Sequence, residues 1–361
     1  MARLHADEFI VLLPGLGRDE DEAAQLAQSQ CRSLLRVLTA PVQFGEREHY
    51  TSASMGIAVF GREALTLDEL LSRADSAMEL AKQDGRNTFK FFDEGLRSQL
   101  AERAMLEAAL RQAVQRDELT LLYQPQIDAS GTLIGAEALC RWTHAEHGPV
   151  PPAVFIMLAE NNGSIYALGE WVLRTACRTL ASWKIGTPLG AAAMAVNVSA
   201  RQFHHPDFVT QVLDAVQSAG AEPTRLKLEL TESVVAHDLD SIVTKMRALK
   251  ALGVRFSLDD FGTGYSSLSY LKRLPLDQLK LDQSFVRDLL ANPNDAAIVR
   301  TVIALGDSMG LSVVAEGVET AEQRDMLHAA GCRIFQGYLF SRPLTADALQ
   351  ALASRASAPM A

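Results

Sequence analysis

The stretch Arg225-Leu-Lys-Leu-Glu-Leu230 alternates leucines with charged side chains at a period of two residues. Side chains alternate between the two faces of a β-strand, so this spacing predicts a strand with one apolar and one charged face. Leu279-Lys-Leu-Asp282 repeats the pattern, and Arg255-Phe-Ser-Leu-Asp259 ends in a carboxylate. In an α/β barrel the apolar face packs on helices and the other face points into the lumen. These stretches therefore predict barrel strands that carry charged groups inward.

Short apolar runs of this kind recur after Leu119, and helical stretches such as Trp171–Trp183 and Ala296–Met309 separate most of them. The turn Asp128-Ala-Ser-Gly131 is too short for a crossover helix, so the two strands that flank it should be antiparallel. Eight strands in about 240 residues fit a (β/α)8 TIM-like barrel with an antiparallel first strand. The predicted strands are 119–127, 133–142, 191–198, 225–231, 255–259, 277–282, 311–315 and 333–336.

Residues 1–92 precede the barrel and read as a small, partial α/β segment. It contains predicted strands at 9–13, 52–60 and 88–92 and predicted helices at 19–37 and 67–83. A charged, alanine-rich stretch follows, from Glu94 to Arg116, and predicts a connecting helix. We therefore expect three parts, at 1–92, 93–116 and 117–355.

The composition excludes several classes of protein. The 361-residue chain has a formal charge of −10 and no prominent basic patch, which argues against a bulk nucleic-acid binder. The four cysteines are scattered, which is typical of reduced and mostly buried thiols in a cytoplasmic protein. No signal peptide and no apolar run long enough to span a membrane are recognised in the sequence.

Six carboxylates are predicted to converge in the barrel lumen: Glu137, Glu229, Asp259, Asp260, Asp282 and Glu316. A single inward carboxylate would favour a structural ion pair, and Lys280 alone would be read as a buried salt-bridge partner. Against Lys280 and Arg141, however, six carboxylates leave a net charge of about −4, which a buried site does not tolerate. Two divalent cations would neutralise it, and a two-metal site suits in-line displacement at phosphorus.

At these residues the chain resembles the EAL family of cyclic-di-GMP phosphodiesterases, over roughly residues 105–352. The naming motif is Glu137-Ala138-Leu139, and seven further blocks match in order. They are Tyr123-Gln-Pro125, Val196-Asn-Val-Ser199, Glu229-Leu-Thr-Glu-Ser233, Asp259-Asp-Phe-Gly-Thr-Gly264, Leu279-Lys-Leu-Asp282, Ala315-Glu-Gly-Val-Glu319 and Gln336-Gly-Tyr338. The resemblance implies hydrolysis of cyclic-di-GMP to linear pGpG.

The resemblance also implies roles for individual residues. The residues similar to the family's metal ligands are Glu137, Asn197, Glu229, Asp259, Asp260 and Glu316. Read alone, Asn197 could instead cap a neighbouring helix. Lys280 resembles the lysine that orients the attacking water, and it is grouped with Glu316 and Glu232 as catalytic. Glu232 would anchor the loop after Asp260 through groups such as Thr263 and Ser266. The residues similar to substrate contacts are Gln124, Arg141, Asp282, Glu319 and Gln336.

The N-terminal segment resembles the second half of a GGDEF domain, the diguanylate cyclase fold. Its motif reads His5-Ala-Asp-Glu-Phe9, and Ser54-Met-Gly-Ile57, Arg73-Ala-Asp75 and Ala81-Lys-Gln-Asp-Gly-Arg-Asn87 match later blocks. His5 and Ala6 replace the two turn glycines, and a turn of that kind needs the freedom of glycine. The first half of the domain is missing, so we expect no synthesis of cyclic-di-GMP.

Two functions remain open: a metal-dependent phosphodiesterase, and a non-catalytic cyclic-di-GMP receptor. The complete ligand set favours the enzyme. Oxygen donors predict two Mg²⁺ or Mn²⁺ ions per site, and Ca²⁺ should bind but inhibit. The resemblance further implies a homodimer formed through the barrel. Half of an α/β domain would expose sheet edges, so we also expect a longer parent protein, which could be membrane-anchored.

Overall fold

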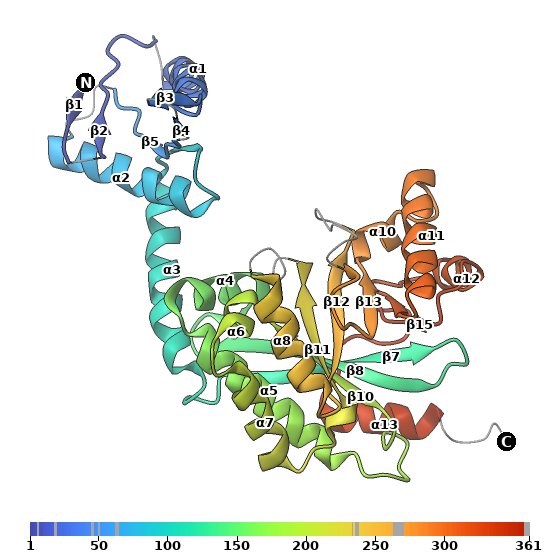
Figure 1. The fold of residues 1–361 in the computed structure, drawn as a ribbon. Coiled ribbons are helices and arrows are strands. Elements are labelled where there is room, and N and C mark those ends of the chain that lie inside the picture. The colour runs from blue at the N-terminus through green and yellow to red at the C-terminus, as the bar shows by residue number, and fades with distance from the viewer. Residues whose placement is uncertain are drawn as a thin grey trace. The chain divides into compact units, whose positions relative to one another are not determined.

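A computed structural model describes residues 1–5, 7–17, 20–44, 47–49, 51–61, 65–232, 234, 238–262 and 271–356 (Figure 1). For residues 20, 21, 44, 47, 94–102 and 356 it describes the backbone alone. The chain forms two compact units, Met1–Leu106 and Glu107–Ala361. Helix α3 (Glu94–Ala113) runs across the boundary between them, where the sequence predicted a helix. No helix in the described ranges is long and apolar enough to cross a membrane.

The first unit contains short strands and two helices. Strand β1 (Ala2–Arg3) pairs antiparallel with β2 (Phe9–Ile10), and β3 (Val42–Phe44) with β4 (Arg47–His49). Strand β5 (Met55–Ile57) pairs in parallel with β6 (Phe89–Phe91). The helices are α1 (Glu20–Leu38) and α2 (Leu67–Gln83). Strands β1, β3 and β4 were not predicted, because runs of two or three residues carry no periodicity.

Helix α2 begins at the residue that the sequence indicated. The Thr66 side chain accepts a hydrogen bond from the backbone N–H of Glu69, and the Glu69 carboxylate accepts one from the backbone N–H of Thr66. This capping box satisfies two N–H groups that would otherwise lack partners. Gly56 on β5 lies against α2, and a Cβ there would meet the Ala74 carbonyl oxygen at 1.9 Å. Glycine at this position therefore permits the close packing of strand and helix.

The second unit is a closed barrel, as predicted. A nine-stranded sheet has the order β10-β11-β12-β13-β14-β15-β7-β8-β9, and an additional pairing of β10 with β8 closes it. Strand β9 lies outside the closed ring and was not predicted. The strands are β7 (Leu119–Asp128), β8 (Leu133–His144), β9 (Gly148–Val150), β10 (Ala193–Val198), β11 (Leu226–Thr231), β12 (Arg255–Phe261), β13 (Gln278–Leu281), β14 (Ser312–Ala315) and β15 (Ile334–Phe335).

The first barrel strand runs against its neighbours. Strand β7 is antiparallel to both β8 and β15, whereas the pairs from β8 through β10 to β15 are parallel. Between β7 and β8, the Asp128 carboxylate accepts hydrogen bonds from the backbone N–H groups of Ser130 and Thr132, at 2.8 and 2.9 Å. Gly131 has a φ of 85°, which favours glycine. The predicted four-residue turn is therefore the structural cause of the antiparallel start.

Helices cover the outside of the barrel in the part of the second unit that is described (Figure 1). Helix α5 (Ile165–Ser182) presents an apolar stripe with a spacing of four residues, at Leu168, Val172, Ala176 and Leu180, which is typical of a core-facing helix. The other helices in the described part of the unit are α4 (Pro152–Asn162), α6 (Ala200–His204), α7 (Phe208–Ala219), α8 (Leu239–Lys250), α10 (Gln283–Arg287), α11 (Pro293–Ser308), α12 (Ala321–Ala329) and α13 (Ala346–Ala356), with a 3-10 turn at Pro223–Arg225.

The predicted alternation along the barrel strands is present. On β11, Leu226, Leu228 and Leu230 belong to the hydrophobic core, while Lys227 and Glu229 are also buried but on the other face. Since the leucines pack outward, the two charged groups lie inside the barrel. The fold thus places ionisable side chains in the lumen.

The four cysteines are free thiols, as predicted, and Cys31, Cys177 and Cys332 are buried. Burial raises the pKa of Cys177 and that of Cys140 to about 12. At neutral pH these two thiols are protonated and are therefore poor nucleophiles.

Candidate active site

Four carboxylates surround one buried ammonium group in the lumen. We call Glu137, Glu229, Asp259 and Glu316 the acidic ring. Lys280 Nζ lies 2.6 Å from Glu229 Oε2, 2.7 Å from Glu316 Oε1, 3.1 Å from Asp259 Oδ1 and 3.4 Å from Glu137 Oε2. Only 1% of the Lys280 side chain is exposed. The structure therefore brings together five of the residues that the sequence assigned to the site.

The barrel register explains why these residues meet. Glu229 on β11 is paired with Asn197 on β10 and with Ser257 on β12, so the polar side chains of neighbouring strands stand at one level. Lys280 on β13 is paired with Val314 on β14. Glu316 follows directly after β14, and its backbone N–H donates to the Leu281 carbonyl. The acidic ring is thus assembled from strands that are distant in sequence but adjacent in the barrel.

Amide side chains hold Glu137 in place. Asn197 Nδ2 donates to Glu137 Oε1 at 2.6 Å, and Gln336 Nε2 donates to Glu137 Oε2 at 2.5 Å. Gln336 Nε2 also donates to Gln124 Oε1 at 3.2 Å, and Gln126 Nε2 donates to Gln336 Oε1 at 3.0 Å. Glu137 therefore has little rotational freedom, which suits a group that must present its oxygens in one direction.

A second polar layer lies along the same strands. Lys227 Nζ donates to Gln278 Oε1 at 2.6 Å, and Gln278 Nε2 donates to Ser312 Oγ at 3.1 Å. Burial lowers the pKa of Lys227 to about 8. The predicted site residues did not include Gln126, Lys227 or Gln278, although the alternation along 225–230 placed Lys227 inside the barrel. Each lies two residues from a selected residue, and period-two spacing along the strand was the signal that would have found them.

The charges in the acidic ring are not balanced. Burial raises the pKa of Glu229 well above its ordinary value, and repulsion from the other carboxylates adds to the rise although Lys280 opposes it. Burial likewise raises the pKa of Glu316 to about 8. Burial would lower the pKa of Lys280, but the surrounding carboxylates raise it well above its ordinary value. One ammonium cannot neutralise four carboxylates, so without further cations the ring retains protons near neutral pH.

The donor set fits hard divalent cations. The ring offers carboxylate oxygens, Asn197 adds an amide, and both are ligands that Mg²⁺ and Mn²⁺ prefer. Glu229 Oε1 is buried and has no hydrogen-bond partner, which is costly unless another group satisfies it. The donors fit by their chemistry but not by their arrangement, because within the described ranges no three His, Cys, Asp or Glu side chains are grouped so as to hold a metal ion. Lys280 Nζ occupies the point where the carboxylates meet.

Asp260 and Asp282 lie apart from the contacts of Lys280. Asp260 has a φ of 54°, a left-handed conformation that is unusual for a residue other than glycine. Burial raises its pKa to about 6, and the negative charges of Asp259 and Asp282 add to the rise. The Asp282 carboxylate accepts a hydrogen bond from the backbone N–H of Ser284 at 2.9 Å and so caps α10.

Glu232 contacts the backbone that follows Asp260. Its Oε1 accepts a hydrogen bond from the Gly262 N–H at 3.1 Å. Thr263 and Ser266, the other groups that the sequence assigned to this anchor, lie outside the described residues. Gly262 has a φ of 103°, and a Cβ there would meet Phe285 at 3.0 Å. A side chain at this position would therefore be both strained and crowded.

Two of the residues that the sequence assigned to substrate contact form hydrogen bonds with residues outside the acidic ring. The Arg141 guanidinium donates to the Cys140 carbonyl at 2.9 Å, and within the described ranges it forms no ion pair. Glu319 is exposed ahead of α12, and its backbone N–H donates to Gln323 Oε1 at 2.8 Å. Of the motif assigned to the cyclase-like segment, His5 and Asp7 are exposed, and Ala6 lies outside the described residues.

Family models match both units. Residues 107–343 match the EAL domain, and residues 1–88 match the diguanylate cyclase GGDEF domain. The first match covers more than half of the chain, and four of the six carboxylates predicted in the lumen lie around Lys280. The chain therefore belongs to the EAL domain family and carries a GGDEF segment before the barrel.

Individual relatives support this assignment. The bifunctional diguanylate cyclase/cyclic di-GMP phosphodiesterase MucR of Pseudomonas aeruginosa is 44% identical over 354 residues, which are 97% of this chain and 50% of that protein. The cyclic di-GMP phosphodiesterase NbdA of the same organism is 40% identical over 351 residues, 97% of this chain and 44% of that protein. The chain thus spans about half the length of the curated relatives it matches.

A solved structure shows the same barrel. The PaMucR phosphodiesterase in complex with c-di-GMP is 46% identical, with a TM-score of 0.66. The match covers 68% of this chain and 99% of that chain. This coverage agrees with a match that is confined to the barrel.

Proposed function

We propose that this chain hydrolyses cyclic-di-GMP to linear pGpG in a reaction that depends on divalent metal ions. The observation that carries the proposal is the acidic ring around Lys280, because it supplies oxygen ligands and an unpaired buried carboxylate oxygen in a chain of the EAL family. Relatives of this chain are named cyclic di-GMP phosphodiesterases, and a similar barrel is described in complex with c-di-GMP.

The metal-binding residues we propose are Glu137, Asn197, Glu229, Asp259, Asp260 and Glu316. Bound Mg²⁺ or Mn²⁺, two per site, would supply an activated water and neutralise charge on the phosphate. Asn197 directs its Nδ2 at Glu137, which leaves its Oδ1 for a cation. Glu229 Oε1 is likewise available. Binding of cations would displace the protons that Glu229 and Glu316 retain, so metal affinity should rise with pH.

Lys280 has a separate role in the proposal. Its ammonium contacts all four members of the acidic ring. With these carboxylates engaged by metal ions, the Lys280 N–H groups would donate to the attacking water or to phosphate oxygens, where negative charge develops in the transition state. Because Lys280 is buried on a strand, it meets the reacting group with little loss of side-chain entropy.

The substrate contacts are proposed as the sequence indicated them. Arg141 suits a phosphate oxygen because its guanidinium is engaged only by a backbone carbonyl in the part of the chain that is described. Gln336 borders the acidic ring through its hydrogen bond to Glu137, and it also donates a hydrogen bond to Gln124. Asp282 and Glu319 lie at the starts of α10 and α12. These last two carboxylates are candidates for the N–H groups of a guanine base.

Product analysis tests the proposal. The purified chain is incubated with cyclic-di-GMP and Mg²⁺, and the nucleotides are separated by chromatography, with a chelator as control. We expect pGpG to appear only with the metal. If no product forms but equilibrium dialysis shows that cyclic-di-GMP binds, the chain is a receptor and the proposal is wrong. A metal-independent reaction would contradict the role of the acidic ring.

A further inference from the structure

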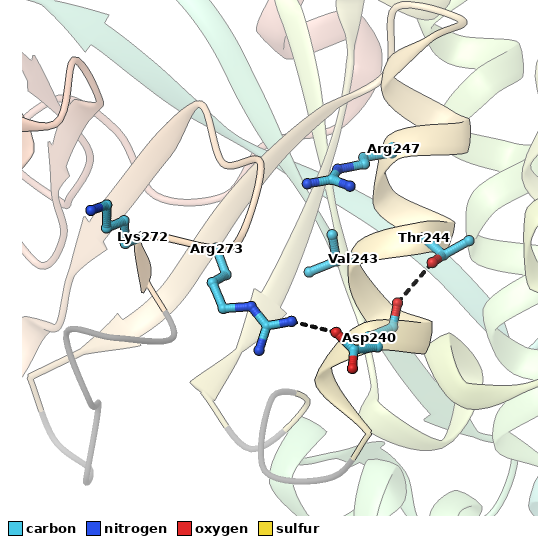
Figure 2. Close-up of a pocket in the computed structure, with 6 residues that line it drawn as sticks. All are labelled: Asp240, Val243, Thr244, Arg247, Lys272 and Arg273. Carbon is cyan, nitrogen blue, oxygen red and sulfur yellow. Dashed lines mark hydrogen bonds and ion pairs between the residues drawn. The ribbon is translucent and has the colours of Figure 1, made fainter.

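A basic pocket lies on the surface of the second unit and is lined by no residue of the acidic ring (Figure 2). It is lined by Asp240, Val243, Thr244, Arg247, Lys272 and Arg273 and has a volume of about 410 Å³. Four of these residues belong to α8, and the other two precede β13. None of them is among the residues assigned to catalysis, metal binding or substrate contact. The pocket is therefore a separate feature that the proposed phosphodiesterase activity does not explain.

The charge of the pocket is opposite to that of the chain. The pocket is lined by three cationic residues, Arg247, Lys272 and Arg273, and by one carboxylate, that of Asp240, whereas the whole chain carries a formal charge of −10. In Figure 2 the Lys272 side chain extends away from Asp240. In Figure 2 the Arg247 and Arg273 side chains extend into the space between α8 and the segment before β13. Like charges that are close together repel, so this arrangement is more favourable with an anion between them than without one.

Asp240 occupies the place that such an anion would take. Its carboxylate forms an ion pair with the Arg273 guanidinium, which bridges α8 and the segment before β13. The Asp240 side chain is 86% exposed and that of Arg273 is 53% exposed, so the pair is weak and readily exchanged. The ordinary reading of such residues is a solvated helix face. Here, however, the cations come from two segments and line one concavity.

We propose that the basic pocket binds the phosphate group of a small phosphomonoester. The lining carries more cations than carboxylates, and this excess of positive charge suits a phosphomonoester, which carries roughly −1.5 to −2 at neutral pH. Two arginines provide the forked donors that bind phosphate oxygens in pairs. The volume exceeds that of a phosphate group alone, and Val243 offers an apolar surface to the attached organic part. The inference does not rest on the phosphodiesterase activity.

Calorimetric titration of the full chain with ribose 5-phosphate and with inorganic phosphate tests this site. Ribose 5-phosphate has no base, so a guanine-binding site does not recognise it. We expect ribose 5-phosphate to bind more tightly than inorganic phosphate, and acetate to bind far more weakly than either. Raising the salt concentration should weaken binding, because the site is exposed. Equal affinity for acetate and phosphate would overturn the proposal, and equal affinity for phosphate and ribose 5-phosphate would overturn the assignment of an organic part.

Variants locate the binding. The double variant Arg247→Gln, Arg273→Gln should lose at least about tenfold in affinity, since two charged donors are removed. Asp240→Asn should strengthen binding because it frees Arg273 and removes the competing carboxylate. Arg300→Gln, an exposed arginine on α11 that lines a different surface depression, is the matched control and should bind normally. Unchanged affinity in the double variant would overturn the proposal, and so would loss of binding in Glu137→Gln, which would place the ligand in the lumen.

Discussion

Lys280 Nζ lies 2.6 Å from Glu229 Oε2, while the other oxygen of the same carboxylate is buried without a hydrogen-bond partner. One side of Glu229 is therefore neutralised and the other is not. A buried acceptor without a partner costs free energy, so this half of the carboxylate is a point at which a cation would be stabilised. Lys280 and the proposed metal ions would therefore contact the same carboxylate, that of Glu229, through different oxygens.

Replacing Lys280 with alanine should reduce kcat by about 10²–10³-fold, the loss typical of one donor to a developing charge. The effect on KM should be smaller, because the ammonium acts chiefly in the transition state. Steady-state kinetics with cyclic-di-GMP measures both. Lys250→Ala removes a lysine that pairs with Asp277 outside the lumen and serves as the control. A change confined to KM would assign Lys280 to ground-state binding.

Replacing Glu137 with alanine should lower activity by orders of magnitude while the barrel remains folded. The variant removes a proposed metal ligand and the acceptor of hydrogen bonds from Asn197 and Gln336. Turnover assays and circular dichroism together measure activity and folding. The matched control is Glu170→Ala, an exposed glutamate that pairs with Arg174 on α5. Near-normal turnover of the Glu137 variant would show that the metal site lies elsewhere.

The pattern of apolar and polar residues was enough to predict the lumen but not its internal contacts. Alternation along 225–230 and 279–282 placed Glu229 and Lys280 inside the barrel, and the short turn at Asp128 predicted the antiparallel start. The contact between Lys227 and Gln278 was not predictable, since it joins strands that are not adjacent and depends on the register of β12, which shifts between Leu258 and Phe261. The spacing of residues along a strand predicts the face of the sheet on which a side chain lies, but the register between strands decides which side chains it contacts.

The backbone of Asp260 shows a second limit of the sequence. Two consecutive aspartates at a strand end predict carboxylates on opposite faces. The structure instead places Asp260 at a φ of 54°, and the alternation is interrupted there. An aspartate tolerates this conformation better than most residues, but nothing in the pattern requires it. Asp260 was predicted to point into the lumen together with Asp259, and regular alternation by itself does not account for such a placement.

Stability of the metal-free protein should fall as the pH rises between about 4.5 and 8. In the folded chain burial raises the pKa of Glu316 to about 8, while in the unfolded chain this group titrates near its ordinary value of 4.5. The folded state therefore retains a proton that the unfolded state loses, and that contribution to stability disappears through this window. Thermal melts at several pH values in chelator should show this slope, and it should be smaller in Glu316→Gln. An equal slope in both proteins would contradict the assignment.

Mg²⁺ and Mn²⁺ should support turnover, whereas Ca²⁺ should bind and inhibit. The ring and Asn197 are oxygen donors, so all three ions can bind, but the longer bonds and looser geometry of Ca²⁺ misplace the nucleophile. Turnover is measured with each ion after removal of bound metal, and Ca²⁺ is then added in competition with Mg²⁺. Equal rates in Ca²⁺ and Mg²⁺ would show that ligand geometry does not control the reaction.

Glu232 connects the end of β12 to metal binding. Its carboxylate accepts the Gly262 N–H, two residues beyond Asp260, and so restrains the backbone that presents this proposed ligand. Glu232→Ala should therefore weaken Mg²⁺ affinity by about 10–100-fold, as losses of groups that orient ligands do, although Glu232 is not itself assigned as a ligand. Activity measured across a range of Mg²⁺ concentrations gives the affinity, and Glu232→Gln keeps an acceptor and should retain most of it.

The same contact offers a route by which association of two chains could act on catalysis. The resemblance to the EAL family predicts pairing through a face near the loop after Asp260, and pairing would select one conformation of the backbone that Glu232 holds. Light scattering at micromolar protein should then give the mass of a dimer, and dilution into monomer should lower both Mg²⁺ affinity and turnover. In Glu232→Ala the two effects should separate, because the dimer would still form while its influence on the metal is lost. A strictly monomeric protein with full activity, or a Glu232→Ala variant with unchanged Mg²⁺ dependence, would count decisively against the coupling.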